Sequence, residues 1–267
     1  MQVITEQYHT FYYLKSMTEN PFLDSAMIIL AMMMIVYIIA LIKHDYSVID
    51  ISWPLGFLFI SIFILDWSGT WNEILVKAFV TIWSLRLCSY LFYRIMKHGP
   101  DKRYKELEYG WGENHRIHAF FKIYMLQGFL MYWIAMPITT TPFVVESNII
   151  VLVLGSTLWV LGFILESVAD YQLYSYRKKP EHQGKYLMTG LFYYSRHPNY
   201  LGESLLWIGI GVLALPSSYW FLAMLGPGIL IAALYRFSGV PYAERNRKGA
   251  VFQHYVKNTG AIFPKIF

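Results

Sequence analysis

Apolar residues dominate seven long stretches of this sequence, and polar residues gather between them. A helix that crosses a bilayer needs about 20 mostly apolar residues, so each stretch is a candidate transmembrane helix. We therefore predict an all-α membrane protein with about seven transmembrane helices in a single domain, 1–267. The stretches lie at about 24–42, 48–65, 74–96, 121–142, 148–169, 200–215 and 218–236.

The distribution of positive charge predicts how the chain is oriented. Two long connections, 97–119 and 170–199, and the polar tail, 237–267, are rich in Lys and Arg. Cytoplasmic loops of membrane proteins carry an excess of these residues. We therefore expect an external N-terminus, a cytoplasmic C-terminus and a tail folded back on the cytoplasmic face. Lys77, at the outer start of the third stretch, is the one exception on the opposite side, whose connections contain neither Lys nor Arg: 66–73, 143–147 and 216–217.

The composition agrees with a membrane protein and excludes several other classes. The chain is 56% hydrophobic and only 15% charged, whereas soluble domains carry about 25% charged residues. The net charge of +5 is accounted for by the predicted cytoplasmic segments and does not indicate nucleic-acid binding. The single cysteine, Cys88, excludes an internal disulfide and a cysteine metal cluster, and we expect no metal. The first 20 residues lack the pattern of a cleavable signal peptide.

Four of the predicted helices carry polar or aromatic residues at helical spacing, three or four positions apart. The simplest arrangement brings these four stripes to one cavity that opens to the cytoplasm. The stripes are Asp50 and Trp53; Trp83, Arg86, Tyr90 and Arg94; Glu166, Asp170, Tyr174 and Arg177; and Asn199, Glu203, Trp207 and Gly211.

Some of these residues also have plainer interpretations. Lys97 and Lys178 fit interfacial anchors whose amines reach the lipid head groups, and Asp50 fits a helix cap. Arg86 is harder to explain in this way, because a cation near the middle of a span costs about 2.5–3.5 kcal/mol and needs a carboxylate or an anion. The tryptophans fit an aromatic belt or simple packing: Trp53, Trp83 and Trp207.

The start of the sixth stretch has the features of an anion site. Pro198 suits the first position of a helix, whose free N–H groups and dipole favour an anion. Arg196 adds positive charge, and His197 can donate to a phosphate or carboxylate or serve as a capping or structural histidine. Three more cations on the same side are available to phosphates: Arg177, Lys178 and Lys179.

Several of these residues stand in motifs that are familiar together: Glu166-x-x-x-Asp170-x-Gln172, Thr189-Gly190-Leu191-Phe192, the run from Ser195 to Glu203, Ser238-Gly239-Val240-Pro241 with Glu244, Arg86-Leu87 and Arg103-Tyr104. With them the chain resembles, from Asp50 onward, the DUF1295 branch of the steroid 5-alpha-reductase-like membrane proteins. The Arg-His-Pro-x-Tyr-x-Gly part also occurs in isoprenylcysteine carboxyl methyltransferases and related membrane methyltransferases.

The resemblance implies seven spanning helices that enclose NADPH, with an apolar enone lipid reduced by hydride transfer. It implies that Glu203 and Trp207 line the cavity between cofactor and substrate. Glu166 stands where the steroid reductases have an amide side chain. The positions that match cofactor contacts are Arg86, Tyr90, Asp170, Arg177 and Asn199.

The sequence departs from the steroid reductases at the positions that polarise the substrate carbonyl. Those enzymes have a Gln-Glu pair in the second helix and a tyrosine in the third. Here the second helix offers Asp50 and Trp53, and the tyrosine position is Trp83. Trp53 or Tyr90 is the candidate replacement, and Tyr90, Asp50 or water is the expected proton donor.

Three hypotheses follow from the sequence. The first is an NADPH-dependent reductase of an apolar conjugated substrate, in contact with lipids of a bacterial inner membrane. The second is a methyltransferase that uses S-adenosylmethionine on a lipid-linked acid or amine, and the third is a lipid-binding or scaffold protein. In the reductase, the nicotinamide points towards Glu203 and Trp207. The adenosine and phosphates lie on Arg177, Lys178, Arg196, His197 and Asn199.

Overall fold

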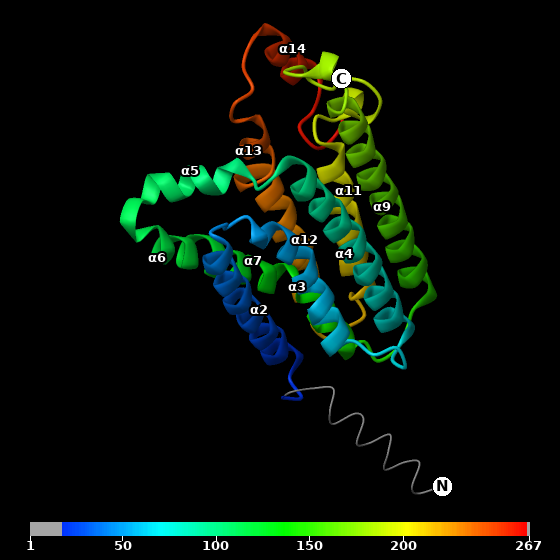
Figure 1. Cartoon of the computed structure of the whole chain (residues 1–267). Coiled ribbons are helices and arrows are strands. Elements are labelled where there is room, and N and C mark those ends of the chain that lie inside the picture. The colour runs from blue at the N-terminus through cyan, green and yellow to red at the C-terminus, as the bar shows by residue number, and fades with distance from the viewer. Residues whose placement is uncertain (1–17, 266–267) are drawn as a thin grey trace, which may run out of the picture. The chain divides into compact units, whose positions relative to one another are not determined.

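The computed structural model describes residues 18–265, and this part of the chain is built from helices, without a β-strand. The all-α prediction is therefore confirmed. All seven apolar stretches lie in helices (Figure 1). These helices are α2 (Pro21–Lys43), α3 (Val48–Ile64), α4 (Trp71–His98), α7 (Leu126–Ile134) with α8 (Met136–Thr140), α9 (Ile149–Arg177), α11 (Pro198–Leu213) and α12 (Trp220–Ala232).

Fewer than seven of these helices are long enough to span a bilayer. Within residues 18–265, four helices qualify by length and composition, or five if a pair bent by 45° forms one span. At about 1.5 Å per residue, α3 and α11 reach only about 25 Å, short of the roughly 30 Å hydrocarbon core. The chain fits a multi-pass membrane protein, while seven spans and the orientation of the termini stay predictions. The qualifying segments are Pro21–Lys43, Trp71–Lys97, Ile149–Arg177, Trp220–Glu244 and the bent pair Arg103–Ile134 with Met136–Phe143.

The long connections and the tail contain helices that the apolar pattern does not predict. These helices are short, so none of them forms an apolar run of membrane length, and α5 alone among them begins with a side-chain cap. The side chain of Asp101 accepts a hydrogen bond from the backbone nitrogen of Arg103 at 3.0 Å and so begins α5. The added elements are α5 (Lys102–Trp111), η1 (Gly112–Asn114), α6 (His115–Ala119), η4 (Pro180–His182), α10 (Leu191–Tyr194), α13 (Val240–Glu244) and α14 (Ala250–Asn258). Three further elements overlap the apolar stretches: η2 (Phe120–Met125), η3 (Thr141–Phe143) and η5 (Ala233–Phe237).

The chain divides into two compact units. The first comprises the described residues up to Asn148 with Leu213–Leu225, and the second comprises Ile149–Val212 with Gly226 onward. In the first unit, α2, α3 and α4 pack side by side, with α7 and α8 against α2 and α3 (Figure 1). Its core is apolar, with the side chains of Met33, Ile49, Phe57, Ile60, Trp83 and Met131 fully buried.

One buried cation in the first unit explains an exception to the charge pattern. Lys77 lies on the predicted external side, yet it is only 4% exposed. Its ammonium donates to the carbonyl oxygens of Leu65, at 2.8 Å, and Ile62, at 3.4 Å, where α3 ends. The last carbonyls of a helix lack partners within the helix and carry partial negative charge. Lys77 is therefore a C-terminal cap for α3.

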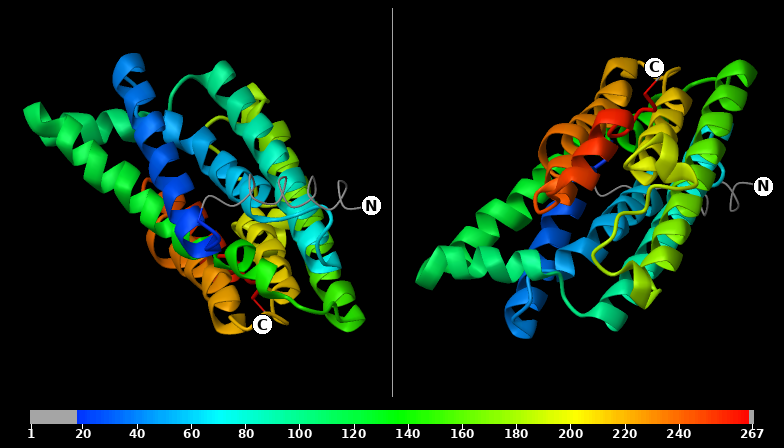
Figure 2. Two further views of the ribbon diagram at one scale, coloured as in Figure 1. Left: turned by 90° about the horizontal axis from the view of Figure 1, so that it is seen from below. Right: turned by 90° about the horizontal axis from the view of Figure 1, so that it is seen from above.

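In the second unit, glycines bring the backbones of α9 and α11 into direct contact (Figure 2). A Cβ atom on Gly162 would lie 2.4 Å from the backbone nitrogen of Leu206, and one on Gly209 would lie 2.6 Å from the carbonyl oxygen of Gly155. Small residues allow this approach between helices in membranes. Gly155, early in α9, contacts Gly209, late in α11, whereas Glu166, later in α9, contacts Gly202, earlier in α11. The two helices are therefore antiparallel.

Candidate functional site

The antiparallel register of α9 and α11 aligns two of the predicted polar stripes. Gly202 packs on Glu166, because a Cβ atom there would lie 2.4 Å from the Glu166 backbone nitrogen. Asp170 is one turn further along α9, which places it level with the start of α11 at Pro198. Both carboxylates are buried, with 4% of Glu166 and 7% of Asp170 exposed. The half-buried Asn199 belongs to the same end of the helix pair.

The other members of these stripes extend in both directions along the two helices. Glu203 is half-buried, and Trp207, one turn further along α11, is fully buried. In the other direction, Arg177 ends α9 and is exposed, as is Lys178. A gradient from buried apolar through buried acidic to exposed basic groups therefore runs along the α9–α11 pair.

Arg196 and His197 lie just before α11 and are held by a carboxylate from the tail. The guanidinium of Arg196 binds Glu244 through both oxygens, with Nε to Oε1 at 2.8 Å and Nη2 to Oε2 at 3.2 Å. His197 Nε2 lies 2.8 Å from Glu244 Oε1. We call Arg196, His197 and Glu244 the Glu244 cluster. Arg196 and His197 are almost fully buried, and bidentate pairs of this kind are the strongest hydrogen-bonded ion pairs.

Backbone hydrogen bonds join the same segment to the tail. The backbone nitrogens of Arg196 and His197 donate to the carbonyl oxygens of Gly260 and Ala261, both at 2.9 Å. Arg196 Nη1 donates to the carbonyl oxygen of Thr259. Within the second unit, the tail thus folds back on the segment before α11. Binding of a phosphate by Arg196 and His197, as predicted from the sequence, would require them to give up some of these bonds.

The protonation state of His197 follows from its surroundings. Burial lowers the pKa of His197 below its ordinary value of 6.5, although Glu244 opposes the shift. A neutral imidazole carries one N–H group, and Nε2 must hold it in order to donate to the Glu244 carboxylate. The ring also stacks on Tyr200, with centroids 5.0 Å apart. His197 is therefore a neutral structural donor at pH 7.

We expect this histidine to make the protein less stable in acid. Between the lowered pKa of folded His197 and 6.5, the unfolded chain binds a proton that the folded chain does not. Stability is therefore fully present above pH 6.5 and is lost as pH falls through the folded pKa. Thermal unfolding at pH 7.5, 6.5 and 5.5 should show a smaller slope for His197→Gln than for the parent. Equal slopes would assign the acid sensitivity to other groups.

In the first unit, Asp50 is paired with groups from two other helices. Tyr104 donates its hydroxyl to Asp50 Oδ1 at 2.6 Å, and Arg103 Nη2 lies 3.2 Å from Oδ2. Arg94 Nη2 is 3.7 Å from the same oxygen. The Arg103-Tyr104 motif thus serves as an anchor for Asp50, which links the start of α5 to the start of α3. The structure shows Asp50 as an acceptor of hydrogen bonds, and its role as a proton donor stays a prediction.

The remaining candidates in the first unit lie among aromatic rings. The guanidinium of Arg86 stands over the ring of Tyr90, 5.8 Å from its centroid. Trp53 packs edge-on against Phe57 at 5.5 Å, and Phe57 packs against Trp83 at 5.9 Å. Packing, one of the two interpretations open for these tryptophans, accounts for both. The stripes of α3 and α4 belong to the first unit, and those of α9 and α11 belong to the second, with Lys178, Arg196 and His197. A single cavity lined by all four stripes therefore stays a prediction.

Sequence reasoning missed the acceptors that surround Arg196. Glu244 was noted as part of a motif, but it is 48 positions away, and the other acceptors are backbone carbonyls of the tail. Backbone acceptors leave no residue-specific signal in a sequence. Among residues 18–265, no group of three or more His, Cys, Asp or Glu side chains is placed to hold a metal ion.

Comparisons with known proteins identify the family of this chain. No solved structure matches it. A protein of Schizosaccharomyces pombe, named "Uncharacterized protein C594.04c", is 24% identical over 301 residues, covering 96% of this chain and 82% of that protein. A family model described as "Protein of unknown function (DUF1295)" matches residues 36–259, a range that contains every predicted site residue. The chain therefore belongs to the DUF1295 family, as its motifs predict.

Proposed function

We propose that this protein is an NADPH-dependent membrane reductase of an apolar conjugated substrate, of the enone, steroid-like or lipid-like class. The α9–α11 contact is the observation that carries the proposal. It sets two buried carboxylates, Glu166 and Asp170, at the end of the helix pair where Asn199 begins the next polar stripe. Buried carboxylates in a membrane-spanning helix are costly and usually functional.

The side chains at this end fit the polar parts of a dinucleotide. Carboxylates accept hydrogen bonds from ribose hydroxyls, and the amide of Asn199 can both donate and accept. Arg177 is seven positions beyond Asp170, which is about 10 Å along the helix axis. Arg177 and Lys178 are exposed, and their positive charges suit the phosphates. The acceptors for sugars and the cations for phosphates thus follow one another along α9.

The chain would contribute binding, orientation and exclusion of water. NADPH supplies the hydride when bound, and that chemistry belongs to the cofactor. Glu203 and the buried Trp207 follow Asn199 at successive turns of α11. These two side chains would line the cavity between the nicotinamide ring and an apolar substrate. Tyr90, Asp50 or water stays the predicted proton donor. A bacterial inner membrane also stays a prediction, since the relative with a stated organism is a fission yeast protein.

Ligand-dependent stabilisation of the detergent-purified protein tests the cofactor directly. We expect NADPH to raise the melting temperature. At a hundredfold excess over Kd, the ligand adds about 2.7 kcal/mol to the free energy of unfolding. Asp170→Asn and Arg177→Gln should reduce the shift, because they remove a ribose acceptor and a phosphate ligand. Lys185→Gln replaces another exposed cation of the second unit, and its shift should match that of the parent. An NADPH shift of equal size in all four proteins would contradict the proposed site.

A methyltransferase is the second candidate, and the Glu244 cluster favours it. The Arg-His-Pro start and a glutamate near the tail are the two features that resemble membrane methyltransferases, and here they are bonded to each other. The same titration separates the candidates. Stabilisation by S-adenosylmethionine, with none by NADPH or NADH, would replace the reductase with the methyltransferase.

A further inference from the structure

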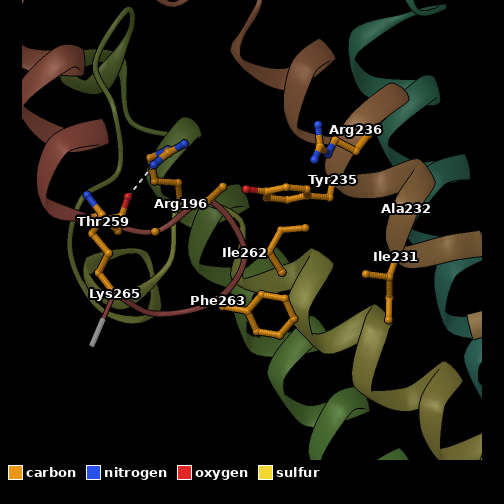
Figure 3. A pocket seen from close by; sticks show the side chains of 11 residues that line it. Arg196, Ile231, Ala232, Tyr235, Arg236, Thr259, Ile262, Phe263 and Lys265 are labelled. Atoms are coloured by element: carbon orange, nitrogen blue, oxygen red, sulfur yellow. Dashed lines mark hydrogen bonds between the residues drawn. The ribbon is translucent and has the colours of Figure 1, made fainter. Parts of the chain in front are cut away.

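The second unit contains a pocket of about 650 Å³ between the end of α12 and the tail (Figure 3). We call it the tail pocket. Its helix side is formed by Ile231, Ala232, Tyr235 and Arg236, and its tail side by the segment 259–263 with Lys265. Arg196 completes the lining. The Glu244 cluster and the backbone bonds to Gly260 and Ala261 hold the tail in place.

The tail pocket joins an apolar surface to a membrane-spanning segment. Ile231, Ile262 and Phe263 supply apolar lining, and 59% of Phe263 is exposed. Figure 3 shows these three side chains on the same side of Tyr235, away from Arg236. The helix side belongs to the candidate span Trp220–Glu244. An apolar surface here is accessible to lipid chains.

The charges of the tail pocket are positive, and no acidic side chain lines it. Glu244 neutralises Arg196. Arg236 is exposed, with its guanidinium 5.9 Å from the centroid of the Tyr235 ring. The Lys265 ammonium donates one bond to the carbonyl oxygen of Lys257, and within residues 18–265 no carboxylate forms an ion pair with it. An ammonium has three N–H groups, so two more can donate to a ligand.

The position of Arg236 along the chain places it where the bilayer meets water. No charged residue occurs from Trp220 to Tyr235, and Arg236 is the first after this apolar run. Sixteen positions of helix extend about 24 Å, close to the thickness of the hydrocarbon core. Basic pockets at the ends of spanning helices are suited to lipid head groups.

We propose that the tail pocket binds a membrane phospholipid with an anionic head group. The phosphate lies on Arg236, whose planar guanidinium accommodates two phosphate oxygens. Lys265 provides the second cation, and the acyl chains follow Ile231 and Phe263. A free phosphate would not use this apolar side of the pocket. Arg196 belongs both to this lining and to the residues predicted to hold the cofactor phosphates, but Glu244 neutralises it. The lipid site uses Arg236 and Lys265 instead, so it does not rest on the reductase proposal.

Short-chain lipids that differ only in head group test the proposal on the full-length protein in neutral detergent. We expect dihexanoyl-phosphatidylglycerol to raise the melting temperature more than dihexanoyl-phosphatidylcholine, since both contain a phosphate but only the first has a net negative charge. Arg236→Gln should weaken phosphatidylglycerol binding about fivefold, and Lys265→Gln by a similar factor. Both side chains are exposed, so we expect these variants to fold.

Controls distinguish a lipid from other sources of phosphate. Arg245→Gln removes an exposed arginine of the same unit that does not line the pocket, and it should bind phosphatidylglycerol like the parent. Inorganic phosphate at the same concentration should give no shift. Equal stabilisation by both lipids, an unchanged response in Arg236→Gln, or a shift with inorganic phosphate as large as that with phosphatidylglycerol would each overturn the proposal.

Discussion

Replacing Glu244 with glutamine is expected to lower the free energy of unfolding by about 3–5 kcal/mol, the usual cost of removing one partner from a buried ion pair. Glu244 binds Arg196 through two oxygens and His197 through one. Glutamine has almost the same shape but no charge. The guanidinium of Arg196 is almost fully buried and would be left without a counter-ion.

The loss should also be visible in the tail. Arg196 and His197 are bonded to Thr259, Gly260 and Ala261, so loosening the Glu244 cluster releases this segment. We expect faster trypsin cleavage in the tail of Glu244→Gln at temperatures where the helices remain folded.

The measurement is thermal or denaturant unfolding in detergent, with Glu181→Gln as the matched control. Glu181 is exposed on η4 of the same unit, and changes at exposed sites usually stay within about 0.5 kcal/mol. The double variant Arg196→Gln/Glu244→Gln should lose less than the sum of the two single variants, because it leaves no unpaired charge. A Glu244→Gln protein as stable as Glu181→Gln would show that the cluster adds little to stability.

The helices could be predicted from the sequence because apolar runs are a strong and local signal. α2 and α4 match their predicted stretches with additional residues at both ends, and α9 begins at Ile149 and continues to Arg177, past the predicted end at 169. α5 and α14 could not be found this way, since each has only about ten residues and mixes polar with apolar side chains. The number of spans is harder to predict, because α3 and α11 have only 17 and 16 residues and fall short of the length that marks a clear span.

Part of the candidate site could also be predicted from the sequence. The spacing of Glu166 and Asp170 placed both carboxylates on one stripe, and both are buried. The position of these carboxylates relative to α11 depends on the contact between Gly162 and Gly202. Nothing in the sequence indicates which helix a glycine packs against. The Arg196 environment was unpredictable for a different reason. Its acceptors come from 48 positions or more along the chain, and most are backbone atoms.

Gly202→Leu should strongly destabilise the second unit, with a loss of about 3 kcal/mol, the upper end of the usual range for overpacking. A Cβ atom at this position would lie 2.4 Å from the backbone nitrogen of Glu166 and 2.7 Å from the carbonyl oxygen of Gly162. Backbone atoms within a helix cannot rotate away as a side chain can. The larger residue must therefore push α11 away from α9.

The same displacement should weaken the proposed cofactor site. The contact of Gly202 with Glu166 places Glu166 and Asp170 beside the start of α11. If the helices separate, both carboxylates move relative to Asn199. Gly202→Ala adds only the Cβ atom and should show a smaller loss of stability together with a reduced NADPH shift. Gly228→Leu is the matched control, because no atom lies within 4 Å of its Cβ position. If Gly202→Ala has the same stability and the same NADPH response as Gly228→Leu, the two helices can separate without consequence. The α9–α11 contact would then no longer support the proposed function.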